Sequence, residues 1–164
     1  MESDVGKMAE FDFLLGEWNL EYRVPKSPFG EAETGSGEGT IKRALGGRYI
    51  FFDYHAVLEK SGEGAAHAVF AWDGKADVFR YWWFEDSGSF LTATCDFVDE
   101  GTLRLNWHDT LLVQTFQKQG PDQMILRMER PVSGGAYEVI LEVLFTRKYG
   151  AFFETNVKER EWTA

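Results

Sequence analysis

The chain has 164 residues, a formal net charge of −10 at pH 7 and 44% hydrophobic residues, so we expect one domain, 1–164, that buries a core without a disulfide or a structural metal. The acidic balance excludes the basic surface that a nucleic-acid partner requires, and it disfavours binding to anionic lipid. Residues 1–10 lack the apolar run of a signal peptide, and no stretch approaches the roughly 20 apolar residues of a membrane helix, which predicts a cytoplasmic protein with no membrane partner.

A short amphipathic helix over residues 4–15 is the first predicted element. Gly16 directly follows this pattern and is typical of a helix end. We therefore expect residues 1–15 to form a helical cap across one end of a barrel made of residues 16–164. The apolar residues at helical spacing are Met8, Phe11, Leu14 and Leu15.

Beyond Gly16 the apolar residues recur at every second position, which is the period of a β-strand. Apolar and polar residues alternate over 18–24, so Trp18 and Tyr22 are expected on one buried face. The glycine-rich run 35–39 precedes a strand and no helix, so it is expected to be a flexible loop or a bulged edge rather than a phosphate-binding loop. The other predicted strands are 37–45, 49–59, 67–72, 78–85, 90–98, 103–107, 111–118, 123–130 and 137–148, with a final strand or tail at 151–158.

Short connections join these strands, and Asp73–Gly74 is a strong hairpin signal. Short connections indicate antiparallel neighbours, because parallel pairs need a long crossover. So many strands in one sheet curl up, and closure removes the exposed edges. The predicted fold is therefore all-β: a single antiparallel up-and-down barrel of about ten strands with a short N-terminal helix, favoured over a two-sheet sandwich.

Four motifs span nearly the whole chain: Phe11–Trp18 (FDFLLGEW), Leu45–Tyr49 (LGGRY), Arg80–Ser87 (RYWWFEDS) and Leu144–Lys148 (LFTRK). With these motifs the chain resembles calycin-type barrels, the group of lipocalins and fatty-acid-binding proteins. It resembles more closely the bacterial domain-of-unknown-function family 1579 within that group. The resemblance implies a lipocalin-like barrel from a bacterium and carries no general activity, so it assigns no catalytic residue.

The chain is also similar to nitrobindins, which hold haem through a histidine on a late strand. The late strands predicted here, 123–130 and 137–148, contain no histidine, so haem is not expected. None of the three histidines has a metal-site spacing, and Cys95 is the single cysteine, so neither a metal nor another cofactor is predicted. Cys95 is expected to be a buried, unreactive thiol.

Aromatic residues make up 16% of the chain, and their rings must turn inward from consecutive strands. About eight strands are just filled by side chains, so about ten are expected to enclose a cavity. Tyr and Trp bring polar tips to its wall, and Met adapts to an irregular ligand. The expected partner is thus a small apolar or aromatic molecule. The residues predicted to bind it are Trp18, Tyr22, His55, Arg80, Trp82, Trp107, Met128, Arg130 and Tyr137.

The charged members of this set each allow two interpretations. Arg130 and Arg80 each share an apolar strand face, and either one could meet a ligand carboxylate or extend into solvent at the rim. His55 lies two positions after Asp53, so both side chains share a face. The pair is an oriented base if that face is internal and a surface pair if it is external.

Three functional hypotheses follow. The leading hypothesis is non-covalent binding of a small molecule inside the barrel. The first alternative is an isomerase, cyclase or lyase that uses His, Tyr or Asp groups of the cavity as acid and base, so whether the protein is an enzyme stays open. The second is a filled barrel that acts as a homodimeric interaction module. Consecutive residues of a strand point to opposite faces, so Trp82 or Trp83 must lie outside the barrel or under the N-terminal helix, and an exposed aromatic patch there would mark a dimer interface.

Overall fold

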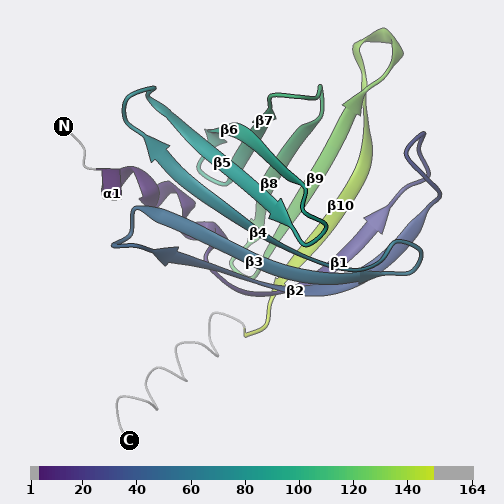
Figure 1. Cartoon of the computed structure of the whole chain (residues 1–164), viewed down its shortest axis with the longest axis horizontal. Helices are drawn as coiled ribbons and strands as arrows, with labels where there is room; N and C mark the ends of the chain where they lie inside the picture. The colour runs from purple at the N-terminus through teal and green to yellow at the C-terminus, as the bar shows by residue number, and fades with distance from the viewer. Residues whose placement is uncertain (1–3, 150–164) are drawn as a thin grey trace, which may run out of the picture.

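The computed structural model describes residues 4–149, which form a closed barrel of ten antiparallel strands (Figure 1). The strands pair in sequence order, and β1 also pairs with β10, which closes the ring. The predicted all-β barrel with a short N-terminal helix is confirmed, and the predicted strand or tail at 151–158 lies outside the described residues. The strands are β1 (Gly16–Val24), β2 (Glu33–Ala44), β3 (Tyr49–Leu58), β4 (Gly62–Asp73), β5 (Val78–Glu85), β6 (Phe90–Asp99), β7 (Thr102–Trp107), β8 (Val113–Gly120), β9 (Gln123–Pro131) and β10 (Tyr137–Arg147).

The helical cap, residues 4–14, lies across one end of the barrel (Figure 1). It consists of one α-helical turn, α1 (Asp4–Lys7), and a 3-10 helix, η1 (Met8–Leu14), rather than the single helix that the sequence predicted. A second 3-10 turn, η2 (Ser133–Gly135), lies between β9 and β10, and no helix in the described part of the chain is long and apolar enough to cross a membrane. A 3-10 helix repeats every three residues, and the three fully buried side chains of η1 have this spacing: Met8, Phe11 and Leu14.

The half of the barrel next to the cap is filled with aromatic rings. Phe11 reaches in from η1 and contacts the rings of Phe70, Phe79 and Phe97, with centroids 4.9 to 5.1 Å apart. These distances are typical of favourable edge and tilted ring pairs. The cap is therefore part of the hydrophobic core and not an addition to its surface.

Arg147, at the end of β10, ties the cap to the barrel. Its Nε donates a hydrogen bond to the backbone oxygen of Pro121 at 2.9 Å, and its Nη1 donates to the backbone oxygen of Leu15. The guanidinium group also lies 4.3 Å from the centre of the Trp18 ring. Trp18 in turn donates from Nε1 to the backbone oxygen of Leu14 at 2.9 Å, so one buried cluster holds η1, β1 and β10 together.

The glycine-rich run 35–39 is not a loop or a bulged edge but the middle of β2. Its residues alternate glycine with a polar side chain, and the glycines take the inward positions, opposite Leu58, Ala56 and Tyr54 of β3. A Cβ atom at Gly39 would lie 2.9 Å from the ring of Phe52, closer than packed atoms tolerate. The missing side chain at Gly39 leaves room for the ring of Phe52.

A bulge in β10 divides this strand into two parts that face differently. The pairing with β9 shifts between Val139 and Leu141: Val139 lies opposite Glu129, whereas Leu141 lies opposite Met128. An extra residue in one strand turns the side chains beyond it to the other face. The prediction that Tyr137 shares the inner face with Leu141 is therefore wrong, because the bulge turns Tyr137 outward, where it is 54% exposed.

The packed half generates a prediction about stability. Replacing Phe11 by Ala removes a ring with contacts on three sides, so the free energy of unfolding should fall by about 3–5 kcal/mol. Phe29→Ala is the matched control, because Phe29 is 72% exposed and its loss should change the value by less than about 0.5 kcal/mol. Urea denaturation followed by tryptophan fluorescence measures both. Equal effects of the two changes would show that the cap does not belong to the core.

Candidate functional site

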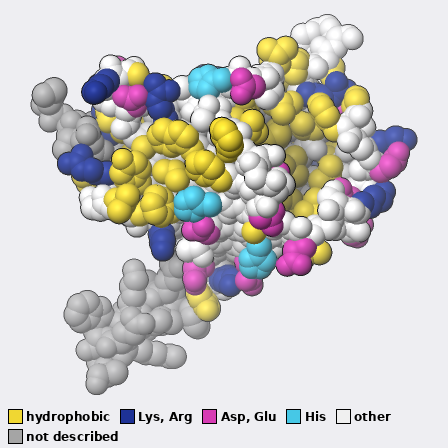
Figure 2. Space-filling view, viewed as in Figure 1, with side chains coloured by type: hydrophobic (Ala, Val, Ile, Leu, Met, Phe, Trp, Pro, Cys, Tyr) yellow, Lys and Arg dark blue, Asp and Glu magenta, His cyan; other side chains and the backbone are white. Residues whose placement is uncertain are grey.

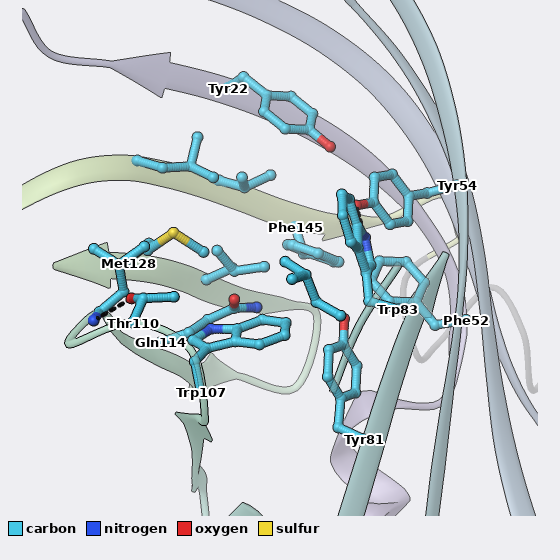
Figure 3. Close-up of a pocket in the computed structure, with 15 residues that line it drawn as sticks. Tyr22, Phe52, Tyr54, Tyr81, Trp83, Trp107, Thr110, Gln114, Met128 and Phe145 are labelled. Carbon is cyan, nitrogen blue, oxygen red and sulfur yellow. Dashed lines mark hydrogen bonds between the residues drawn. The ribbon is translucent and has the colours of Figure 1, made fainter. Parts of the chain in front are cut away.

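The half of the barrel opposite the cap contains a cavity of about 240 Å³. It opens between the loops that join the strands at this end, and its side chains converge from the barrel wall (Figure 3). The space-filling view shows the apolar interior through this opening (Figure 2). The cavity is lined by Tyr22, Phe52, Tyr54, Tyr81, Trp83, Leu91, Trp107, Thr110, Leu112, Gln114, Leu126, Met128, Leu141, Val143 and Phe145.

Three phenylalanines separate the cavity from the packed half. Phe52, Phe116 and Phe145 come from β3, β8 and β10, and their ring centroids lie 5.9 to 6.5 Å from one another. Each is at most 2% exposed. Such a cluster of mutually packed rings is a rigid floor, so the void above it does not collapse into the core.

Three tyrosines place phenol groups in the cavity wall. Tyr22 lies on β1, Tyr54 on β3 and Tyr81 on β5. Burial raises the pKa of each phenol above its ordinary value of 10.0, and for Tyr81, which is 2% exposed, it raises the pKa well above that value. All three phenols are therefore neutral at physiological pH.

Two indoles in the wall differ in what their N–H groups bind. Nε1 of Trp83 donates a hydrogen bond to the hydroxyl oxygen of Tyr54 at 2.8 Å. Nε1 of Trp107, in contrast, is buried and has no hydrogen-bond partner. Within residues 4–149 no other fully buried side-chain nitrogen or oxygen lacks one. A buried donor without an acceptor costs the folded state about 1–3 kcal/mol. The Trp107 N–H is therefore a polar group that the protein itself leaves unsatisfied.

Gln114 of β8 is a second polar group among apolar neighbours. It is 4% exposed, faces inward opposite Leu105 and Met128, and lines the cavity. Within the described residues its side-chain amide makes no hydrogen bond. Figure 3 shows this amide directed into the cavity beside the indole of Trp107.

No charged side chain of the described residues lines the cavity. Arginines of β1 and β9, two of the strands that line it, pair with carboxylates. Arg130 lies on the inner face of β9 at the rim and donates from Nε to Glu138 at 3.0 Å. Arg127 and Arg23 both pair with Glu142. The interior is thus an uncharged, largely apolar space with a few polar tips.

The structure brings three of the nine predicted binding residues together at the cavity: Tyr22, Trp107 and Met128. Trp18 also faces inward, but it lies in the packed half beneath the cap and is 1% exposed. Arg130 faces inward at the rim without lining the cavity, and Tyr137 is turned outward by the bulge.

The other three predicted residues, His55, Arg80 and Trp82, lie on the outer face of the barrel. On β5 the inward residues are instead the buried Phe79 and Tyr81, together with Trp83, which lines the cavity. Both faces of this strand are apolar in sequence, so the alternation did not indicate which one turns inward. The pairing across the sheet decides it, because Tyr81 lies opposite the buried Phe70.

The outward position of His55 answers the question left open for the pair with Asp53. Both lie on the outer face of β3, and Asp53 contacts a different histidine: Nδ1 of His67 lies 2.6 Å from its Oδ1. His67 and Asp53 are directly opposite each other on β4 and β3. The interpretation as a base inside the cavity is therefore wrong, and the surface pair that Asp53 forms is with His67 rather than with His55.

An apolar patch covers part of the outer face of β3, β4 and β5 (Figure 2). Phe51, Val69 and Trp82 lie in one row across these strands, directly opposite one another in register. Trp82 and Trp83 thus point to opposite faces, as the sequence predicted. The homodimer stays a prediction.

Sequence reasoning missed seven polar or aromatic cavity residues: Phe52, Tyr54, Tyr81, Trp83, Thr110, Gln114 and Phe145. The signal for Gln114 was present, because Leu112, Gln114 and Phe116 share one face and a polar residue interrupts an apolar alternation. Tyr54 shares the face of Ile50 and Phe52, but both faces of this strand begin as apolar.

Metal and thiol chemistry find no support among the described residues. Within 4–149 no group of three or more His, Cys, Asp and Glu side chains is arranged to hold a metal ion. Cys95 is buried on β6, and burial raises the pKa of its thiol far above the ordinary range. This thiol is protonated at neutral pH and is a poor nucleophile.

Comparison with known proteins identifies the fold. The chain is similar to Rv2717c from M. tuberculosis (12% identity, TM-score 0.58, 86% of this chain and 96% of that one). It is also similar to the S-type phycobiliprotein lyase CPES from Guillardia theta (11% identity, TM-score 0.56, 85% and 91%). A de novo designed fluorescence-activating β-barrel aligns at a TM-score of 0.46 (12% identity, 84% and 95%).

The likeness to the first two structures shows a calycin-like barrel and nothing about activity. No family model matches the chain, and no curated protein sequence matches it. The resemblance to family 1579 therefore stays a prediction.

The buried phenols generate a prediction about pH. The folded-state pKa of Tyr81 is raised above the unfolded value of 10.0, so its contribution to stability is complete below pH 10 and is lost as the pH rises further. Tyr81→Phe should therefore lose about 1.4 kcal/mol less stability than the unmodified protein between pH 9 and pH 11. Urea denaturation at both pH values measures this. Identical losses in the two proteins would contradict the burial of the phenol.

Proposed function

We propose that the protein binds a small, neutral, apolar or aromatic molecule non-covalently in the cavity. The observation that carries this proposal is a void of about 240 Å³ above a rigid phenylalanine floor, with apolar walls and an opening at the rim. An engineered apolar cavity of about 150 Å³ accepts benzene, so this larger space suits a molecule of one or two rings. Aromatic walls with a few convergent polar groups are typical of small-molecule sites.

The absence of charge in the lining supports a neutral ligand. A carboxylate inside the cavity would meet neutral phenols, indoles and an amide, and no cationic side chain of the described residues would compensate its desolvation. The two arginines for which the sequence left a ligand carboxylate as one of two interpretations pair within the protein: Arg130 with Glu138 and Arg80 with Asp73. Fatty acids are therefore poorer candidates than neutral ring compounds.

The cavity favours binding over acid–base chemistry. An isomerase or lyase needs a group that accepts a proton near neutral pH. Among the described lining residues the titratable groups are phenols whose pKa is raised, and these donate hydrogen bonds rather than accept protons. The proposal therefore assigns no chemical step to this cavity. It is also independent of the predicted cytoplasmic location.

A cavity-filling variant tests the site. Isopropenylbenzene, a small apolar aromatic probe, should bind the unmodified protein in a calorimetric titration. Leu112→Trp places an indole where Leu112 lines the cavity, and it should weaken this binding about tenfold or more. Leu111→Trp is the matched control on the same loop, because Leu111 is 79% exposed, and it should bind as the unmodified protein does.

The outcome that overturns the proposal is specific. If isopropenylbenzene does not bind at all, or if it binds equally to Leu112→Trp and Leu111→Trp, the cavity is not the binding site. Thermal melting of both variants shows whether each is folded, so that loss of binding is not confused with loss of structure.

A charged probe tests the predicted neutrality of the ligand. Benzoate and benzamide have nearly the same shape, but only benzoate carries a charge. Because a buried carboxylate without a partner loses several kcal/mol of solvation, benzoate should bind at least about 100-fold more weakly than benzamide at pH 7. Comparable affinities would indicate a cationic group at the ligand and would contradict the uncharged lining.

A further inference from the structure

We infer that the natural ligand carries a carbonyl group, and that the indole N–H of Trp107 and the side-chain amide of Gln114 bind it. This inference rests on the proposed function and adds the chemical class of the ligand. It depends on two polar groups at one place in an otherwise apolar cavity, each without a partner among the described residues.

Trp107 supplies the first part of the argument. An indole N–H donates a hydrogen bond and accepts none, so the group that satisfies it must be an acceptor. Trp83 lines the same cavity, and its N–H is already bound to the hydroxyl oxygen of Tyr54 at 2.8 Å. The protein therefore satisfies one of its two cavity indoles internally and leaves the other with a buried, unpaired Nε1.

Gln114 supplies the second part. The inward neighbour of Gln114 on its own strand is the fully buried Phe116, and the residues opposite it are Leu105 and Met128. An apolar side chain would fit this position without the cost of a buried amide. The amide nevertheless lies in the cavity wall at 4% exposure, which is the arrangement of a group that binds a ligand.

The register brings the two groups to one place. Leu105 of β7 lies opposite Gln114 of β8, so Trp107, two residues further along β7, is the diagonal neighbour of Gln114 on the same inner face. Diagonal neighbours lie within reach of long side chains. Figure 3 shows the amide of Gln114 beside the indole of Trp107 in the cavity wall. The ring of Tyr81 completes this corner, with its centroid 5.5 Å from that of Trp107.

The chemistry of these groups selects the ligand class. A donor-only N–H and an amide N–H can both point to one oxygen with two lone pairs, which a carbonyl oxygen provides. A carboxylate also accepts two hydrogen bonds, but the uncharged lining does not compensate its charge. The class that fits is a neutral ring compound with a ketone, amide or lactone carbonyl, bound with its ring over the phenylalanine floor.

A matched pair of probes isolates the carbonyl. Acetophenone and isopropenylbenzene share one carbon skeleton and differ in whether C=O or C=CH₂ is attached to the ring. One hydrogen bond to a carbonyl should make acetophenone bind about 3- to 10-fold more tightly. Trp107→Phe removes the N–H and keeps an aromatic ring, so it should bring this ratio close to one, and Gln114→Leu should lower it.

Trp83→Phe is the matched control, because Trp83 lines the same cavity and its N–H is already paired within the protein. It should change the affinities for both probes together and keep their ratio. A measurement on the unmodified protein needs no variant to fold: the Trp107 indole proton should move downfield in NMR spectra on addition of acetophenone and not on addition of isopropenylbenzene.

The results separate the inference from the proposed function. If both probes bind with equal affinity and the Trp107 signal does not distinguish them, the carbonyl inference is wrong, whereas the proposed binding function stands. If neither probe binds, both are wrong. If Trp83→Phe abolishes the ratio and Trp107→Phe preserves it, the carbonyl is recognised elsewhere in the cavity and the assignment of Trp107 is overturned.

Discussion

Pairing of β1 with both β2 and β10 is the constraint on which the rest of this structure depends. The ring of backbone hydrogen bonds fixes an interior whose width is set by the number of strands rather than by the side chains inside it. Ten strands enclose more space than eight, so the interior is filled only where large rings or a separate segment enter it. A cavity is therefore a consequence of closure, and its position depends on which half receives the filling.

Side chains fill the barrel interior at one end more completely than at the other. The helical cap contributes three fully buried side chains to one half, and Phe11 alone contacts three rings there. No equivalent segment among residues 4–149 covers the other half, where the floor of Phe52, Phe116 and Phe145 is followed by open space. The same aromatic composition thus stabilises the fold at one end and lines a binding space at the other.

Few polar groups lie in that space, and only some of them have a hydrogen-bond partner within the protein. The Trp83 N–H is satisfied by the hydroxyl oxygen of Tyr54, and Arg130 at the rim is bound to Glu138. Trp107 and Gln114 remain without partners among the described residues. A protein keeps such unsatisfied groups at a cost in stability, and the cost is removed when a ligand supplies the missing acceptor. This difference, rather than the size of the cavity, is what indicates the chemistry of the ligand.

The sequence by itself determined the class of fold, because alternation of period two, short turns and one helical stretch are local properties of the chain. It also placed Tyr22, Trp107 and Met128 on inner faces, since their strands have one apolar and one polar face. Only the tertiary structure decided the rest. On β5 both faces are apolar, so the register with β4 selected Tyr81 over Arg80 and Trp82. On β10 a bulge turned Tyr137 outward. Which side chains point inward, and which buried polar groups find a hydrogen-bond partner, both depend on contacts with strands that are distant in the sequence. A local sequence pattern contains no information about those contacts.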